Sequence, residues 1–393
     1  MIEIAIDELG IGNDKTAYVM LPANKNTVID AMDRAKVFGE TFVRIENCDD
    51  FPELSGFEFS EEPTLDELNF LAKRLEEISN DTSEKCAYRA LLRKPMDTIN
   101  EAINRTYNLQ TIPVYPCKNV YQYGEIVLEN EMLKELDDVP DEVYDLLDPD
   151  KVGRAMADRE GGVFVDGYYV VTSGYEPVLA YDDVLPEPQE DWVFRLEVAE
   201  IPERPEDISK VKTEILTLPA DEKYMQKIAK QLGEKYIGDC NIMQFESAIP
   251  QINDSAVESA DDVYLLNEIA RKYSGLSRED AAKFKAVLQT ESWNSLDDAK
   301  GILNSLGGYD FDISVTDASD FGKKYLSAML PPDFDRSLLE GVNAAELARN
   351  VLHANGGAIT LYGAVSDYGG QLYSMIEAPQ QEQENKFEMG GIS

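Results

Sequence analysis

The chain has 393 residues, enough for two domains with cores of their own, and its 43% hydrophobic content is that of a folded protein. It carries 76 acidic residues against 36 basic ones, for a net charge of −40 and an isoelectric point near 4.2. Such a charge repels nucleic acid and anionic membranes and attracts basic surfaces. We therefore expect a cationic protein partner and no direct contact with nucleic acid or membrane.

Targeting and cofactor signals are weak. The start, MIEIAIDELG, has neither the basic region nor the apolar run of a secretory signal, and no apolar stretch approaches the roughly 18 residues that span a bilayer. We expect a soluble, cytoplasmic protein. The four cysteines are far apart and form no C-x-x-C pair, which predicts isolated buried thiols of a reducing compartment rather than a zinc site or disulfides. No cofactor is expected.

The first half of the chain mixes strand and helix patterns. Short apolar runs at 3–6 and 17–21 predict strands. In TLDELNFLAKRLEEIS, at 64–79, leucines recur at spacings of three and four, and Thr64 with Glu67 forms a capping-box pattern, so we expect an amphipathic helix. Another helix is expected over 119–136. GGVFVDGYYVV, at 161–171, predicts a hairpin in which Gly161 and Gly162 form a turn rather than a phosphate cradle.

The second half begins after an acidic, proline-containing segment, 181–192, which predicts a linker. Strands are expected over 192–201 and 214–220, and helices over 277–289 and 295–307. The polar, low-complexity stretch 371–393 predicts a disordered tail. Together these patterns predict an α+β fold built from small pieces.

The sequence also contains an internal duplication. VMLPANKNTVIDAMDRA near Leu21 recurs as LTLPADEKYMQKIAKQL near Leu218, 197 residues later. Because four landmarks recur in one order at nearly one spacing, we predict two tandem repeats, 1–180 and 193–370. The other matching pairs, at offsets of 195 to 198 residues, are Asn69 with Asn267, Ala72 with Ala270, Gly124 with Gly322 and Gly161 with Gly356.

One stretch concentrates the negative charge. ELDDVPDEVYDLLDPD, from Glu135 to Asp150, holds eight carboxylates and no basic residue. Pro140 and Pro149 predict short helical turns that present the acids outward. Carboxylates three or four residues apart on a helix lie roughly 5–6 Å apart at Cβ, close to the spacing of phosphates on a nucleic-acid strand. The apolar residues expected to anchor these turns inward are Val139, Val143, Tyr144, Leu146 and Leu147.

Other interpretations of the acidity remain. A single acidic run is usually a solvated face, and this interpretation stays open for the run taken alone. A calcium loop is a poor match because Val152 and Arg159 stand where an EF-hand needs ligands. General adaptation to high salt would explain the composition but not a local concentration of acids.

Catalysis has little support in the sequence. His353 is the only histidine, and GIGNDK at Gly10 lacks the third glycine of a nucleotide-binding loop. Acid–base work by two carboxylates is possible in any acidic chain, but no pair stands out. We therefore expect a binding protein and not an enzyme.

Several motifs in each repeat follow the order seen in one known family. The first repeat shows DELNFLAKRLEEIS, DTINEAINRTYNLQTIPVY, NVYQYGEIVLENEM and REGGVFVDGYYVV, and the second shows YLLNEIARKYSGLS, SLDDAKGILNSLGGYD, FGKKYL and NGGAITLYGAV. In this order, the motifs resemble the "ELN-LA" helix, the helix ending in "YD", the "V-S--DLG-YY" helix and the "EGG-F---GYV" hairpin of ArdA-type antirestriction proteins of mobile elements. The resemblance covers most of both repeats.

The resemblance implies an elongated protein of small α+β subdomains that imitates DNA and occupies the DNA-binding groove of type I restriction-modification enzymes. Duplex DNA has one charge per roughly 1.7 Å, so forty excess charges correspond to about 68 Å of duplex. Family members act as dimers, which implies a homodimer or, through the duplication, a pseudo-dimer within one chain. The alternative is an acidic module for another basic protein, such as a CRISPR effector or a nucleoid protein.

The acids expected to form the partner-binding surface lie on the predicted helices and in the acidic run. We expect no catalytic or metal-binding residue. The surface residues are Asp66, Glu67, Glu76, Glu77, Asp137, Asp138, Asp141, Glu142, Asp145, Asp148, Asp150, Asp261, Asp262, Glu279, Asp280, Asp297 and Asp298.

Overall fold

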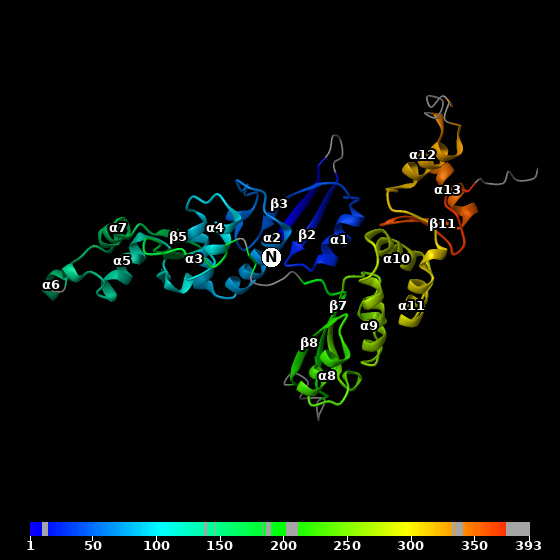
Figure 1. The fold of residues 1–393 in the computed structure, drawn as a ribbon. Coiled ribbons are helices and arrows are strands. Elements are labelled where there is room, and N and C mark those ends of the chain that lie inside the picture. The colour runs from blue at the N-terminus through cyan, green and yellow to red at the C-terminus, as the bar shows by residue number, and fades with distance from the viewer. Residues whose placement is uncertain are drawn as a thin grey trace, which may run out of the picture. The chain divides into compact units, whose positions relative to one another are not determined.

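A computed structural model describes residues 1–9, 15–136, 140–144, 146–182, 184–185, 190–201, 211–331, 334 and 341–374, except the side chains of 136, 141 and 142. The fold is α+β, as predicted: it consists of small subdomains, each of which combines a small antiparallel sheet with helices (Figure 1). The chain divides into two units, Met1–Trp192 and Val193–Ser393, called unit 1 and unit 2 below. The GIGNDK segment lies outside the described residues except for its last lysine.

Unit 1 begins with a three-stranded sheet in the order β2-β1-β3, formed by β1 (Ile2–Glu8), β2 (Thr16–Leu21) and β3 (Thr41–Cys48). Ile2, Ile4 and Ile6, on one face of β1, are fully buried in the core, and Ala5 on the other face is buried as well. The helices that pack in this subdomain are α1 (Lys25–Arg34), α2 (Leu65–Ser79), α3 (Thr82–Leu92) and α4 (Ile99–Asn104), with 3-10 turns η1 (Pro52–Leu54) and η2 (Leu109–Thr111).

Helix α2 confirms the helix predicted over 64–79. Leu68, Leu71 and Leu75 are buried along one face. The capping box is present: Thr64 Oγ1 accepts from the backbone N–H of Glu67, and the Glu67 carboxylate accepts from the backbone N–H of Thr64 at 2.8 Å. Local sequence therefore determined this element, because its periodicity and its cap agree.

The second subdomain of unit 1 contains the sheet β4-β6-β5, with β4 (Val114–Tyr115), β5 (Val163–Val165) and β6 (Tyr168–Val170). The hairpin predicted at 161–171 is confirmed, and Gly161 ends the preceding helix at φ +64°, as a turn-forming glycine should. Its helices are α5 (Val120–Glu129), η3 (Lys134–Leu136), α6 (Asp141–Tyr144) and α7 (Pro149–Glu160). The helix expected over 119–136 thus ends seven residues early.

Helices α5 and α7 cross closely because two glycines meet there. A Cβ on Gly124 would lie 1.8 Å from the carbonyl oxygen of Pro149, and one on Gly153 would lie 2.1 Å from that of Val120. No side chain fits at either position. The glycines therefore set the distance between the two helices.

Unit 2 has the same order of elements. Its first sheet, β8-β7-β9, comprises β7 (Phe194–Ala199), β8 (Thr213–Leu218) and β9 (Asn241–Ser247), and its second, β10-β12-β11, comprises β10 (Phe311–Asp312), β11 (Gly357–Thr360) and β12 (Gly363–Ser366). The helices are α8 (Glu222–Gln231), α9 (Asp262–Tyr273), α10 (Arg278–Thr290), α11 (Leu296–Asn304), α12 (Ala318–Met329) and α13 (Ala344–Asn355), with turns η5 (Ile237–Asp239), η6 (Asp254–Ala256) and η7 (Leu306–Gly308).

The matched asparagines of the duplication form equivalent hydrogen bonds in both units. Asn69 on α2 is buried and accepts from the backbone N–H of Ala23 at 2.7 Å. Asn267 on α9 is buried and accepts from the N–H of Ala220 at 2.8 Å, and its own side-chain amide donates back to the Ala220 carbonyl. In each unit, a buried side-chain amide thus ties the loop after the second strand to a long helix, α2 in unit 1 and α9 in unit 2.

The segment predicted as a linker, 181–192, is part of unit 1 where it is described. Tyr181 is 3% exposed, its backbone N–H donates to Asn104 Oδ1 and its hydroxyl donates to Glu67 Oε1. Further along, the carbonyl of Glu190 accepts from the N–H of Lys25 at 3.0 Å. A composition rich in proline and acid could not reveal this, since one aromatic side chain is enough to anchor the segment.

The predicted tail, 371–393, also begins inside the fold. Leu372 is fully buried, and the hydroxyl of Tyr373 donates to the carboxylate of Asp312 at 2.6 Å. These two side chains close the small core formed by α12 and α13. The rest of the predicted tail, 375–393, lies outside the described residues.

Candidate partner-binding surface

Several of the predicted surface acids form hydrogen bonds at the N-termini of helices. Asp298 repeats in α11 the capping box of Glu67 in α2, with Ser295 as its partner. Asp280 accepts from the hydroxyl of Ser277 at the start of α10, and Asp262 accepts from two backbone N–H groups at 2.8 Å. Carboxylates are favourable at helix N-termini because the helix dipole and its free N–H groups attract them. These acids therefore stabilise the fold, whatever else they bind.

The acidic run is less uncompensated than its sequence suggests. Helix α7 brings Arg154 to 2.8 Å from the Asp150 carboxylate and Arg159 to 3.0 Å from that of Glu135. The hydrogen bond from Arg154 lowers the pKa of Asp150 below its usual value. Asp148 caps α7 by accepting from the N–H of Asp150. The sequence did not reveal this compensation because Arg154 and Arg159 lie after the run, and only the folded helix α7 brings them to its carboxylates.

The packing predicted for this run is partly wrong. Val143 is 50% exposed and Leu146 is 82% exposed, so neither anchors the turns inward. Tyr144 does anchor them, since its hydroxyl donates to the Leu128 carbonyl. Asp137, Asp138, Val139 and Asp145 lie outside the described residues, as do the side chains of Asp141 and Glu142.

Five predicted acids are exposed and have no structural partner in the described part of the chain. Their side chains form no hydrogen bond or ion pair there, unlike Glu77, which pairs with Arg74. They therefore face solvent without contributing a side-chain cap or an ion pair, and three of them lie in the first turns of α2, α10 and α11. These five, the free acids, are Asp66, Glu76, Asp261, Glu279 and Asp297.

Unit 1 gathers acids around one cleft that the sequence did not single out. The cleft, about 650 Å³, lies between the start of α2 and the start of α4 and is lined by Glu61, Glu62, Asp66 and Glu67. Two of these have local roles: Glu62 accepts from the N–H of Val43, and Glu67 is the cap described above. At an offset of 198 residues unit 2 has no acid at these four positions but Ser259, Ala260, Tyr264 and Leu265, so the acidic lining belongs to unit 1. The run SEEPTLDEL, which includes the start of α2, was the available signal.

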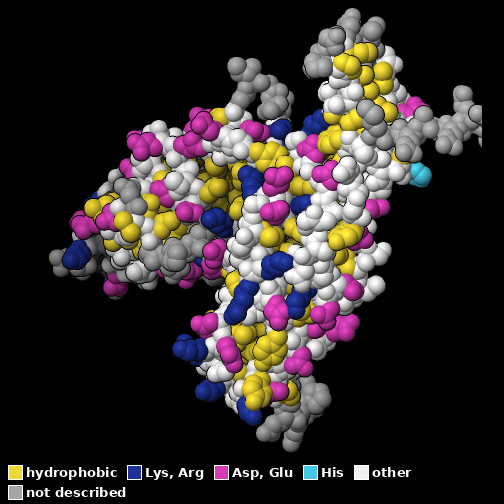
Figure 2. Space-filling model, turned by 45° about the vertical axis from the view of Figure 1, so that its right-hand side comes forward, with side chains coloured by type: hydrophobic (Ala, Val, Ile, Leu, Met, Phe, Trp, Pro, Cys, Tyr) yellow, Lys and Arg dark blue, Asp and Glu magenta, His cyan; other side chains and the backbone are white. Residues whose placement is uncertain are grey.

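The surface view shows how these acids are distributed. On the face in Figure 2, Asp and Glu side chains lie among uncharged and basic side chains rather than in one continuous patch. The negative charge on this face is thus presented as separate carboxylates.

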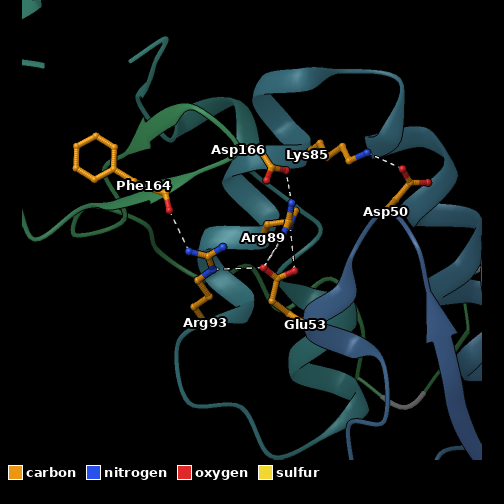
Figure 3. Close-up of polar contacts among 7 residues, drawn as sticks. All are labelled: Asp50, Glu53, Lys85, Arg89, Arg93, Phe164 and Asp166. Atoms are coloured by element: carbon orange, nitrogen blue, oxygen red, sulfur yellow. Dashed lines mark hydrogen bonds and ion pairs between the residues drawn. The ribbon is translucent and has the colours of Figure 1, made fainter. Parts of the chain in front are cut away.

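Two arginines of unit 1, Arg89 and Arg93, form ion pairs that join parts of the fold. Figure 3 shows Arg89 of α3 with both carboxylate oxygens of Glu53 and with Asp166 at the tip of the β5–β6 hairpin. Arg93 reaches the same Glu53 and the carbonyl of Phe164 at 3.0 Å. The guanidinium groups therefore tie the hairpin to α3 and η1. They neutralise acids at this junction and leave other carboxylates exposed.

Residue types that can bind metal ions or carry out catalysis also lie in the described part of the chain. Among the described residues, no three His, Cys, Asp or Glu side chains are grouped so as to hold a metal ion. All four cysteines are buried and unbridged, as predicted, and burial raises the pKa of Cys48 and Cys240 to about 11. His353 is exposed in the last turn of α13. None of the described helices is long and apolar enough to cross a bilayer.

Comparisons with known proteins give no relative from which to transfer a function: no family model matches the chain, and neither does any curated protein.

Proposed function

We propose that this protein is an antirestriction protein that imitates DNA and occupies the DNA-binding groove of a type I restriction-modification enzyme in the cytoplasm. The observation that carries the proposal is the set of free acids, because their charge is exposed and no described residue offsets it. The net charge of −40 and the motif order shared with ArdA-type proteins support it.

The mechanism is occupancy. Lysine and arginine side chains that line a DNA-binding groove meet carboxylates of the inhibitor in place of phosphates. Release of the counterions around both surfaces favours binding, and the long-range field speeds association. The repeated order of elements suggests that the two units of one chain do what two subunits do in the family.

Neutralising free acids tests the proposal without disturbing caps. The variant carries Asp66→Asn, Glu76→Gln, Glu279→Gln and Asp297→Asn. Each exposed charge contributes a few tenths of a kcal/mol, so inhibition of DNA cleavage by a purified type I enzyme should weaken about tenfold at physiological salt. The wild-type chain should block cleavage at near-stoichiometric amounts, and its inhibition should weaken as salt rises, less steeply in the variant.

The matched control removes four exposed acids elsewhere, with Glu40→Gln, Glu129→Gln, Glu176→Gln and Glu222→Gln. Circular dichroism should show the same helix content for both variants. Undiminished inhibition by the free-acid variant would remove these residues from the contact, and an equal loss in the control would mean that net charge alone acts. If the wild-type chain fails to inhibit and instead captures a CRISPR effector or a nucleoid protein, the alternative partner replaces the restriction enzyme.

A further inference from the structure

The two units differ at one edge of their first sheets. In unit 1, the segment 55–62 covers the outer edge of β3. The N–H of Gly56 donates to the Ile45 carbonyl at 3.1 Å, and Glu62 Oε1 accepts from the N–H of Val43 at 3.0 Å. Phe57 and Phe59 pack edge to face and lie against the core. The polar groups of this edge are therefore partly satisfied and the gap beside it is filled.

In unit 2, the corresponding segment 253–260 has the same length but smaller side chains. At the offset of 198 residues that relates Asn69 to Asn267, Ser255 replaces Phe57 and Val257 replaces Phe59. Between this segment and β9 the structure has a groove of about 320 Å³. The loss of two aromatic rings accounts for this space.

The groove exposes the free edge of β9. Strand β9 pairs only with β7, and in the described part of unit 2 no hydrogen bond joins 253–260 to β9. The groove runs along β9 from Asn241 to Phe245, and Met243 is 38% exposed on the same strand. An open strand edge offers a row of backbone N–H and C=O groups that an extended peptide can pair with.

Charge selects the occupant. Asp254 and Glu258 line the groove, and none of its described lining residues is a lysine or arginine. A second copy of a chain with net charge −40 would bring like charges together, so self-association at this edge is unfavourable. A basic segment would place cations against the two carboxylates, and its alternate apolar side chains would fill the space that the two phenylalanines fill in unit 1.

We propose that β9 of unit 2 binds an extended segment of a partner protein, with alternating basic and apolar residues, as an added strand. Asp254 and Glu258 are not among the free acids, and this proposal does not depend on the proposed inhibition of a restriction enzyme. The backbone edge supplies affinity, the groove accepts apolar side chains, and Asp254 with Glu258 selects basic ones.

The experiment uses the full chain and a fluorescent peptide, Lys-Val-Lys-Val-Lys-Val, with Glu-Val-Glu-Val-Glu-Val as the charge-reversed probe. The basic peptide should bind saturably and slow amide hydrogen exchange in β9, whereas the acidic peptide should not bind. Ser255→Phe with Val257→Phe, which copies unit 1 into unit 2, should weaken binding at least tenfold while exchange in β7 and α9 stays unchanged.

Two further measurements keep the result unambiguous. Methylating alternate backbone nitrogens of the basic peptide should weaken binding at least tenfold, because it removes strand pairing and requires no change to the protein. Asp254→Asn with Glu258→Gln should weaken binding several-fold, whereas the matched pair Glu58→Gln with Glu61→Gln in unit 1 should have little effect.

Equal binding of the methylated peptide, or of the wild-type chain and the phenylalanine variant, would overturn the proposal. So would a dimer in sedimentation velocity that the phenylalanine variant abolishes, since the occupant of the groove would then be a second copy.

Discussion

The junction between the long helices and the terminal hairpin is built with different chemistry in the two units. In unit 1, Arg89 of α3 lies between Glu53 and Asp166. In unit 2, the N-cap of the matching helix is 196 residues later, and at that offset Lys285 replaces Arg89. Lys285 is fully buried with its ammonium 4.7 Å from the ring centre of Tyr362.

The neighbouring contacts differ in the same way. Gln289, at the position of Arg93, accepts from the N–H of Leu361 in the hairpin, and Gln251 lies within 3.5 Å of the Tyr362 hydroxyl. One arrangement of helix and hairpin is therefore held by ion pairs in unit 1 and by a cation–aromatic contact with neutral hydrogen bonds in unit 2. The backbone arrangement does not depend on which of the two is used.

The largest expected effect is at the close helix crossing that both units contain. Gly124→Ala in unit 1 and Gly322→Ala in unit 2 would place Cβ 1.8 Å from the Pro149 carbonyl and 2.0 Å from that of Ala344. Helices must separate in both cases, so each change should lower the local free energy of unfolding by roughly 3 kcal/mol, measured by native-state hydrogen exchange of α5 and α12.

Gly301→Ala is the matched control, since it is helical and nothing lies within 4 Å of its added Cβ. It should stabilise α11 slightly. A large loss in one unit only would show that the two helix crossings are not equivalent.

The next largest effect, on the stability of the helix–hairpin junction, should differ between the two units. Arg89→Met removes three hydrogen bonds from the largely buried Glu53 carboxylate and the ion pair with Asp166, and should lower the stability of the unit 1 junction by about 2–3 kcal/mol. Lys285→Met removes the cation–aromatic contact with Tyr362 but also the cost of burying an ammonium group, so the unit 2 junction should lose less stability than the unit 1 junction. Hydrogen exchange in β6 and β12 measures each junction in the full chain.

Lys151→Met, at a side chain 83% exposed, controls for loss of one positive charge and should leave both junctions unchanged. Equal losses from Arg89→Met and Lys285→Met would contradict the comparison.

The smallest expected effect is a pH dependence confined to unit 1. Burial raises the pKa of Glu53, but hydrogen bonds, first of all from Arg89, outweigh it and hold the pKa below the usual 4.5. The folded state thus favours the charged carboxylate. Its stabilising contribution is present above pH about 4.5 and is lost as the pH falls through the folded pKa.

Hydrogen exchange of the unit 1 junction, corrected for intrinsic rates, should be constant from pH 7 to about 5 and then show falling protection. Glu53→Gln should lower protection at pH 7 and reduce this dependence, leaving what other carboxylates such as Asp50 contribute. The unit 2 junction has Gln251 at that position and should lack this component. A pH profile unaffected by Glu53→Gln would show that other groups cause it.

Much of the local structure was predictable from the sequence, and α2 shows why. Its leucine spacing, its cap at Thr64 and its length all lie within a few turns of the chain, so the information is contiguous. The hairpin after Gly161 was predictable for the same reason. The end of α5 was not, because the segment after Glu129 continues to look amphipathic although the helix has ended.

The candidate surface was only partly predictable. Composition and spacing predict the acids but not what each one contacts, and Glu67, Asp262, Asp280 and Asp298 turn out to form hydrogen bonds at helix N-termini. The cleft beside Glu61 and the groove beside β9 were missed altogether. The cleft is formed by segments that are distant in sequence, and the groove depends on how the chain that follows β9 packs beside that strand.

The sequence by itself determined the charge of this protein, its α+β class and the caps and faces of its helices, because these follow from composition and from spacings of a few residues. Only the tertiary structure decided which carboxylates remain free, which arginines are used within a junction, and where a strand edge is open. Those outcomes depend on which side chains come together across the fold, and at the strand edge a difference as local as Ser255 in place of Phe57 accompanies an open groove while the order of strands stays the same.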